Sequence, residues 1–113
     1  MNEGDVILTP LPLADGKVKH RPAIFLREMP PYRDALVCGI STQTQRLQLD
    51  FDELITDHDR DFKDSGLISN SVIRLGFLAV LPRKNIIGSI GSISPERHRR
   101  LLQRLSDYLV REL

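Results

Sequence analysis

Short apolar runs separated by turn-forming residues make up most of the chain before residue 94. The first run covers 6–8 and is stopped by Pro10, and two longer runs cover 21–26 and 35–42. Apolar runs of roughly four to eight residues between Gly, Pro and Asp are typical of β-strands. Pro22 is compatible with a strand only at its start or on a sheet edge. The pattern therefore predicts three strands in the first part of the chain.

Later segments predict the rest of a sheet. Residues 48–51 alternate polar and apolar side chains, which predicts a short fourth strand. The nearly continuous apolar segment 72–81 fits a buried strand or a helix, and its β-branched residues with Gly76 inside favour a strand. Residues 86–87 and 90–93 predict one or two further short strands.

The clearest element is a helix that begins after Ser94. Ser94 suits the N-cap, Pro95 the first helical position and Glu96 the positive end of the helix dipole. Apolar residues then recur at helical spacing: Leu101, Leu102, Leu105, Tyr108 and Leu109. Arginines off that face are predicted to form an outer surface, with RNA contact as the alternative: Arg97, Arg100 and Arg104. Several strands with one helix predict a mainly β (α+β) fold, a small barrel or strongly bent sheet closed by a C-terminal α-helix.

Length and composition favour a single domain over residues 1–113, which are 41% hydrophobic. No apolar run approaches the roughly 18 residues of a membrane span. Residues 1–5 carry two acidic residues and no basic one, unlike a secretory signal. Cys38 is the only cysteine, so an internal disulfide and a thiolate zinc site are excluded. We therefore expect a cytoplasmic protein that does not associate with a membrane.

Charge is unevenly distributed, although the formal net charge is only +1. Residues 50–64 carry seven acidic and two basic side chains, whereas residues 65–113 carry eight basic and three acidic ones. The basic part favours a phosphate ligand and the acidic part repels it. The acidic segment 53–65 predicts a solvated loop with one helical turn.

Several kinds of chemistry are disfavoured by spacing. The three histidines form no HxxxH or HxH pair. Residues 57–61 imitate the start of a calcium loop, but Phe62 and Ile68 replace the required glycine and glutamate. Residues 88–94 match no phosphate-binding glycine motif, and no Gly-x-Ser-x-Gly elbow is present. We expect no metal and no cofactor.

Polar residues gather instead at predicted strand ends. His20 and Arg21 precede the second strand, residues 41–43 close the third, and Arg74 interrupts the apolar segment 72–81. An arginine with a hydroxyl can hold a phosphodiester and stabilise a pentavalent intermediate. RNA supplies its own nucleophile, the 2′-hydroxyl, so such a site needs no metal. The alternative is that Arg21 is a solvated or ion-paired surface residue.

These residues fall in blocks that resemble the MazF/PemK family of toxins. The blocks follow in the family's order: Gly4-Asp5-Val6-Ile7-Leu8, Arg21-Pro22-Ala23-Ile24, Cys38-Gly39-Ile40-Ser41-Thr42-Gln43, Ser71-Val72-Ile73-Arg74 and residues 87–94. The resemblance implies an SH3-like β-barrel, a homodimer, and RNA binding and DNA binding. It further implies the growth-inhibiting toxin of a toxin-antitoxin system, a metal-independent endoribonuclease that cleaves single-stranded RNA (mRNA). Its partner would be a separate antitoxin protein whose acidic or apolar tail covers the RNA groove.

The resemblance also implies a set of site residues. Arg21 falls on the family's catalytic arginine, and Thr42, or Ser41 beside it, falls on the catalytic hydroxyl. Substrate binding is assigned to four further residues: Lys19, His20, Gln43 and Arg74. Some members carry an Arg–Asp acid–base pair where this chain has Ala79 and Pro82, and Asp-Lys where it has Gly76-Phe77. Cleavage would then rest on Arg21 and Thr42 alone, or it has been lost. His20 is an alternative base, but strand spacing predicts that its side chain points away from Arg21 if both lie in one strand.

Two rival functions share these features. One is a catalytically inactive module on the same barrel that binds RNA or the antitoxin. The other is a gyrase poison of the CcdB type, which would act through the C-terminal residues 109–113.

Overall fold

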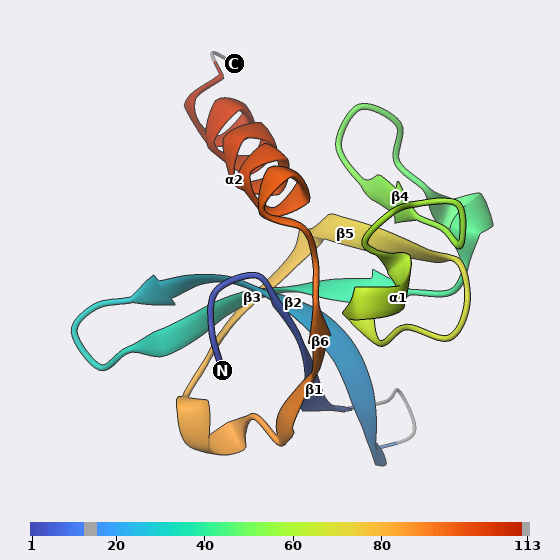
Figure 1. The fold of residues 1–113 in the computed structure, drawn as a ribbon. Helices are drawn as coiled ribbons and strands as arrows, with labels where there is room; N and C mark the ends of the chain where they lie inside the picture. The colour runs from blue at the N-terminus through green and yellow to red at the C-terminus, as the bar shows by residue number, and fades with distance from the viewer. Residues whose placement is uncertain (13–15, 112–113) are drawn as a thin grey trace.

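The computed structural model describes residues 1–12 and 16–111. The strands are β1 (Asp5–Pro12), β2 (Val18–Met29), β3 (Asp34–Ser41), β4 (Glu53–Ile55), β5 (Ser71–Leu81) and β6 (Gly88–Ser92). The helices are α1 (Phe62–Ser65) and α2 (Pro95–Val110), and two 3-10 turns are η1 (Thr44–Arg46) and η2 (Arg83–Asn85). The strands form one antiparallel six-stranded sheet in the order β4-β5-β3-β2-β1-β6. Figure 1 shows this sheet curled into a half-barrel, with α2 standing over one side and α1 against β6.

Both faces of the sheet carry apolar side chains, because successive residues of a strand point to opposite faces. Ile24 of β2 belongs to a buried cluster that includes Leu101 and Leu105 of α2. Its neighbours Ala23 and Phe25 belong to a second cluster on the other face. The first cluster packs α2 against one face of the sheet, and the second cluster lies on the opposite side of the same strands.

Helix α1 packs directly on β6. Gly66 ends α1 in the left-handed conformation with φ 76°, which favours glycine. A Cβ at Gly66 would collide with the backbone carbonyl of Ile90. Because glycine has no Cβ, the end of α1 can lie directly against β6. Any other residue at position 66 would force the two elements apart.

The predicted fold class is confirmed, including the C-terminal helix and its N-terminus. Ser94 is the N-cap, and its Oγ accepts a hydrogen bond from the backbone N–H of Arg97 at 3.1 Å. Leu101 and Leu105 of the predicted apolar face are buried, whereas Tyr108 at the far end of this face is exposed. The sheet therefore covers mainly the first part of the apolar face.

The strand predicted at residues 48–51 is wrong. This segment is a turn, in which the Asp52 carboxylate accepts from the Gln48 backbone N–H at 3.0 Å and Asp50 adopts a φ of 68°. The actual strand is β4 (Glu53–Ile55), within the segment predicted as a loop. The predicted helical turn in that segment is α1.

No helix in the described part of the chain is both long enough and apolar enough to cross a membrane.

Candidate functional site

Arg21 lies in β2 on the same face as Ala23 and Phe25. Its cross-strand neighbour in β1 is the fully buried Thr9, whose hydroxyl donates to the carbonyl oxygen of Arg21 at 3.4 Å. The side chain of Arg21 is half-buried. The backbone of Arg21 is thus held in the sheet, while part of its side chain is open to a ligand.

Ser41 lies on the same face of the sheet as Arg21. The β2–β3 pairing ends at Ala23 and Gly39, and Arg21 and Ser41 lie two residues beyond this pair on their strands. Because side chains alternate along a strand, both lie on the face of Ala23 and Gly39. The Oγ of Ser41 accepts from the backbone N–H of Gln43 at 3.1 Å and retains its own proton for donation.

Thr42 lies just beyond the end of β3. By alternation its side chain leaves the face of Ser41, and it lines a neighbouring pocket of about 540 Å³ with Asp57 and Asn70. Of the two hydroxyls expected from the sequence, Ser41 is therefore the one that shares a face with Arg21.

Arg74 lies on the same face, on the next strand. It pairs with Gly39, so the side chains of Arg21 and Arg74 flank the Ala23–Gly39 pair. With strands about 4.8 Å apart and a rise of about 3.4 Å per residue, their Cα atoms are separated by roughly 12 Å. We call this surface the Arg21 face and define it by Arg21, Ala23, Gly39, Ser41, Arg74 and Phe77.

The remaining residues expected to bind substrate lie around this face. Lys19 is exposed and alternates onto the same side of β2 as Arg21. His20 points to the opposite side of the strand, as the spacing predicts, and Gln43 is exposed just after Ser41. The structure thus places Arg21, Ser41, Arg74 and Lys19 on one face of the sheet and His20 on the other.

The two arginines of the Arg21 face find no counterion among residues 1–12 and 16–111. Neither Arg21 nor Arg74 forms a side-chain hydrogen bond or ion pair with any residue that the structure describes. A guanidinium without a protein partner keeps its donors available for bidentate contact with a phosphate.

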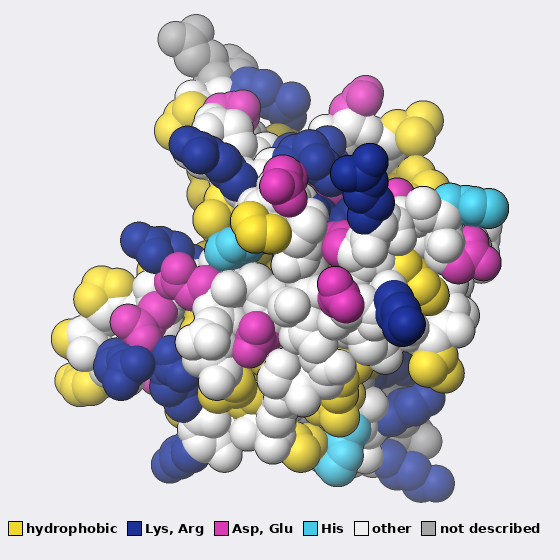
Figure 2. Space-filling model, viewed as in Figure 1, with side chains coloured by type: hydrophobic (Ala, Val, Ile, Leu, Met, Phe, Trp, Pro, Cys, Tyr) yellow, Lys and Arg dark blue, Asp and Glu magenta, His cyan; other side chains and the backbone are white. Residues whose placement is uncertain are grey.

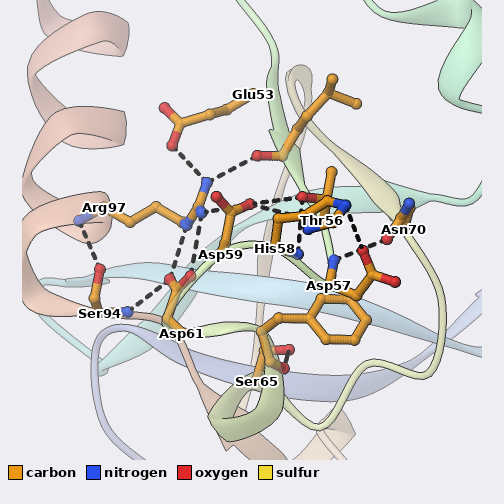
Figure 3. A network of polar contacts seen from close by, with 12 residues as sticks. Glu53, Thr56, Asp57, His58, Asp59, Asp61, Ser65, Asn70, Ser94 and Arg97 are labelled. Atoms are coloured by element: carbon orange, nitrogen blue, oxygen red, sulfur yellow. Dashed lines mark hydrogen bonds and ion pairs between the residues drawn. The ribbon is translucent and has the colours of Figure 1, made fainter.

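Arg97 of α2 has the opposite environment, shown in Figure 3. Its Nε and Nη2 donate to the Asp61 carboxylate at 2.8 and 3.1 Å, and its Nη1 donates to Glu53 Oε1 at 2.7 Å and to the Leu54 carbonyl at 2.9 Å. The side chains of Arg97, Asp61 and Glu53 are 6, 8 and 10% exposed. Oδ2 of Asp59 lies 3.3 Å from Nη2 of Arg97. We call these four residues the Arg97 cluster: Glu53, Asp59, Asp61 and Arg97.

The Arg97 cluster corrects two expectations from the sequence. The acidic segment 53–65 is not simply a solvated loop, since Glu53 and Asp61 are buried counterions. The basic side of α2 is not simply an outer surface, because Arg100 also donates to Glu53 at 3.0 Å and Arg104 donates to the Asp52 carbonyl at 3.0 Å. Figure 2 shows acidic side chains among the basic ones around α2, while other basic side chains lie beside the β1–β2 connection.

Burial and pairing set the ionisation of the cluster. Burial opposes the charge of Asp61, but hydrogen bonds from Arg97 and from the Ser94 N–H outweigh it and hold the pKa of this carboxyl below its ordinary value. The pKa of Arg97 is raised, because its carboxylate partners outweigh the effect of burial. The Asp61 carboxylate also occupies the N-terminus of α2, where a phosphate would otherwise bind.

Other sites considered from the sequence find no support. Among the described residues, no group of three or more His, Cys, Asp or Glu side chains is placed to hold a metal ion. Cys38 is buried, and burial raises the pKa of its thiol to about 12, which makes it a poor nucleophile.

A wider groove lies between α2 and the turn at 48–51, with a volume of about 1100 Å³. None of the expected site residues lines it. Two of its arginines, Arg100 and Arg104, are bound to Glu53 within 3.4 Å. The guanidinium groups of Arg100 and Arg104 are therefore already engaged in contacts that stabilise the fold.

Sequence reasoning missed the part that β5 contributes through Phe77. The register of β5 shifts between Arg74 and Leu78, which places Phe77 over Gly39 on the Arg21 face. The signal in the sequence was Gly76, since a glycine inside a strand often marks a bulge.

The comparisons with known proteins agree with the fold described above. Residues 2–109 match the family model of the PemK-like, MazF-like toxins of type II toxin-antitoxin systems. Among solved structures, the fold is similar to that of the Mycobacterium tuberculosis toxin MazF-mt6, with a TM-score of 0.65 and 18% sequence identity over 95% of this chain and 99% of that chain. A sequence search against curated proteins finds no match. Members of this toxin family are in general dimeric endoribonucleases that bind RNA and antitoxins. The chain belongs to the PemK-like, MazF-like family of toxins of type II toxin-antitoxin systems.

Proposed function

We propose that this protein is the toxin of a toxin-antitoxin system and acts as a metal-independent endoribonuclease on single-stranded RNA. The observation that carries the proposal is the guanidinium of Arg21, which pairs with no side chain in the described part of the chain and lies on the same face as the Ser41 hydroxyl. Family membership supplies the substrate class. Within this proposal, residues 1–113 act as a single domain in the cytoplasm, form a homodimer and bind a cognate antitoxin.

The chemistry is an attack within the RNA. The 2′ oxygen forms a bond to the adjacent phosphorus and passes its proton to water, while the bond to the 5′ oxygen breaks and that oxygen takes a proton from water. The products are a 2′,3′-cyclic phosphate and a 5′-hydroxyl. Extra negative charge develops on the non-bridging oxygens of the pentavalent phosphorus.

Arg21 and Ser41 match these demands. In this proposal Arg21 stabilises the developing charge and donates a hydrogen bond to the leaving oxygen, and Ser41 donates a hydrogen bond that positions the phosphate. Arg74 and Lys19 hold flanking phosphates as cations. Ala79 and Pro82 carry no titratable group, so cleavage depends on charge stabilisation more than on a paired acid and base.

The test is cleavage of a long single-stranded RNA by the purified protein in excess EDTA. Wild-type protein should give discrete fragments, and Arg21→Ala should give none. Arg27→Ala is the matched control, because Arg27 lies in the same strand, is exposed and, among the residues that the structure describes, pairs with Glu3 alone at 2.9 Å. It should cleave like the wild type, since exposed ion pairs contribute about 0–1 kcal/mol to stability.

The absence of the acid–base pair at Ala79 and Pro82 favours one rival, a module that binds without cleaving. Intact RNA after incubation with a folded, antitoxin-free dimer, together with RNA affinity that Arg21→Ala reduces, would establish that rival. A gyrase poison would leave RNA intact and lose toxicity when residues 109–113 are removed.

A further inference from the structure

We propose that Phe77 is a stacking platform for one RNA base, set beside the phosphates held by Arg21 and Arg74. This inference rests on the proposed function, because it assigns a base-binding position to the same face. It concerns the recognition of substrate and gives Phe77 no role in proton transfer.

The first observation is the local distortion of β5. Cys38 pairs with Leu78, but the next residue of β3, Gly39, pairs with Arg74. Leu75, Gly76 and Phe77 therefore lie between two consecutive pairs and form a bulge. Bulges redirect side chains and are frequent next to active sites. This bulge turns Leu75 into the core and leaves Phe77 46% exposed.

The second observation is the seat on which the ring lies. A Cβ built on Gly39 would lie 2.8 Å from Cδ1 of Phe77 and 3.4 Å from its Cγ. Only glycine leaves this approach open without displacement of the ring. The side of the ring at Cδ1 rests on the buried backbone of Gly39, and the exposed part of the ring remains available to a ligand.

The third observation is the charge around the ring. The cross-strand neighbour of Gly39 is Arg74, and its neighbour on the other side is Ala23, two residues from Arg21. Single-stranded RNA is recognised by such combinations, in which cations hold the backbone and an aromatic ring stacks on a base. Small side chains at Ala23 and Gly39 leave the ring as the most prominent apolar group of the Arg21 face.

An exposed aromatic ring also fits the contact between two copies of the chain. The arginines favour RNA instead, because Arg21 and Arg74 lack counterions among the described residues and would remain unpaired in an apolar contact. The experiment below separates the two.

The direct test uses the absence of tryptophan from the chain. In Phe77→Trp the new indole is the only one, and its fluorescence should be quenched when a base of an added RNA stacks on it. The probe is a mixed-sequence 2′-O-methyl RNA oligonucleotide, which lacks the attacking hydroxyl and stays intact. The matched control is Tyr32→Trp, whose ring position is 81% exposed in the β2–β3 turn, away from the Arg21 face. Quenching should occur in Phe77→Trp and not in Tyr32→Trp.

Affinity measurements test whether the aromatic ring itself matters. Phe77→Leu should weaken binding of the same oligonucleotide by about 5- to 150-fold, and Phe77→Tyr should retain affinity, because stacking requires a ring. The salt dependence of binding should be unchanged in Phe77→Leu, since no phosphate contact is lost. In Arg74→Ala the slope of log affinity against log salt should fall by about 0.7.

Several results would overturn the inference. These are equal affinity of Phe77→Leu and wild type, absence of quenching in a protein that binds the oligonucleotide, and a loss of dimer in Phe77→Leu by sedimentation with RNA affinity intact. If the wild type cleaves ordinary RNA and any of these three results is obtained, the stacking platform is wrong and the proposed endoribonuclease stands. Ring-dependent binding without cleavage defeats the endoribonuclease alone, and a folded protein that neither binds nor cleaves RNA defeats both.

Discussion

The Arg97 cluster and the Arg21 face use the same side chain for different ends. Arg97 is 6% exposed and satisfied by Asp61, Glu53 and a backbone carbonyl. Arg21 is half-buried in a strand and bonded to none of the described residues through its guanidinium. The first arginine fastens helix α2 to β4 and to the segment before α1, and the second is available to a ligand.

The difference teaches that counterions, rather than residue type or local sequence, decide what an arginine does. A guanidinium is stable in the protein interior only when carboxylates pair with it. Glu53 and Asp61 of the acidic segment therefore serve to stabilise the fold. A half-buried arginine such as Arg21 keeps part of its hydration, so its charge is tolerated without a counterion until a phosphate binds. Each prediction below changes one side of this comparison.

The largest effect is expected from Arg97→Met. The Asp61 and Glu53 carboxylates would remain buried without their partner, which should lower the free energy of unfolding by about 3–5 kcal/mol. Urea unfolding at neutral pH measures it. Arg99→Met is the control, because the exposed Arg99 lies two residues away on the same helix and makes no ion pair with a described residue, and it should change stability little. Equal stability of the two variants would contradict a structural role for the cluster.

Arg21→Ala should show the reverse pattern. RNA cleavage should fall by about 10²–10³-fold or more, because a donor to the developing oxyanion is removed. The urea midpoint should move little, since the Arg21 guanidinium has no described partner to lose. If Arg21→Ala unfolds more easily and the surviving folded protein cleaves normally, the contrast between the two arginines is wrong.

Ser94→Ala should have a smaller effect on stability. It removes the N-cap acceptor for the Arg97 N–H, which should cost about 1 kcal/mol. Thermal unfolding is the measurement. Ser106→Ala, at an exposed position of the same helix, is the matched control and should be close to neutral.

The smallest and most specific effect concerns Asp61 and acid. Because its folded pKa lies below the ordinary value of 3.8, its charge stabilises the protein above the unfolded pKa, and this contribution is lost as pH falls through the folded pKa. Wild type should be more stable than Asp61→Asn at pH 7, and the difference should shrink below about pH 4. A difference that stays constant down to pH 2 would show that the Asp61 charge is not responsible.

Local patterns predicted most of the fold. The caps at Ser94 and Pro95 located the start of α2, and apolar runs located β2, β3 and β5, because these signals depend on residues close in sequence. The segment 48–51 misled, since the Asp52 side chain bonds back to Gln48 and produces a turn where alternation indicates a strand. Site prediction named Arg21, Ser41 and Arg74, which strand register and alternation place on one face of the sheet, while their roles stay predictions.

The sequence by itself determined most of the strand and helix segments and the family blocks. Tertiary structure decided which of them act together. Ser41 rather than Thr42 shares the face of Arg21 because of the register between β2 and β3, and Phe77 joins that face because β5 bulges over Gly39. Arg97 meets carboxylates 36 and 44 residues away in sequence. Pairings over such separations are fixed by the packing of the whole chain, on which local spacing carries no information.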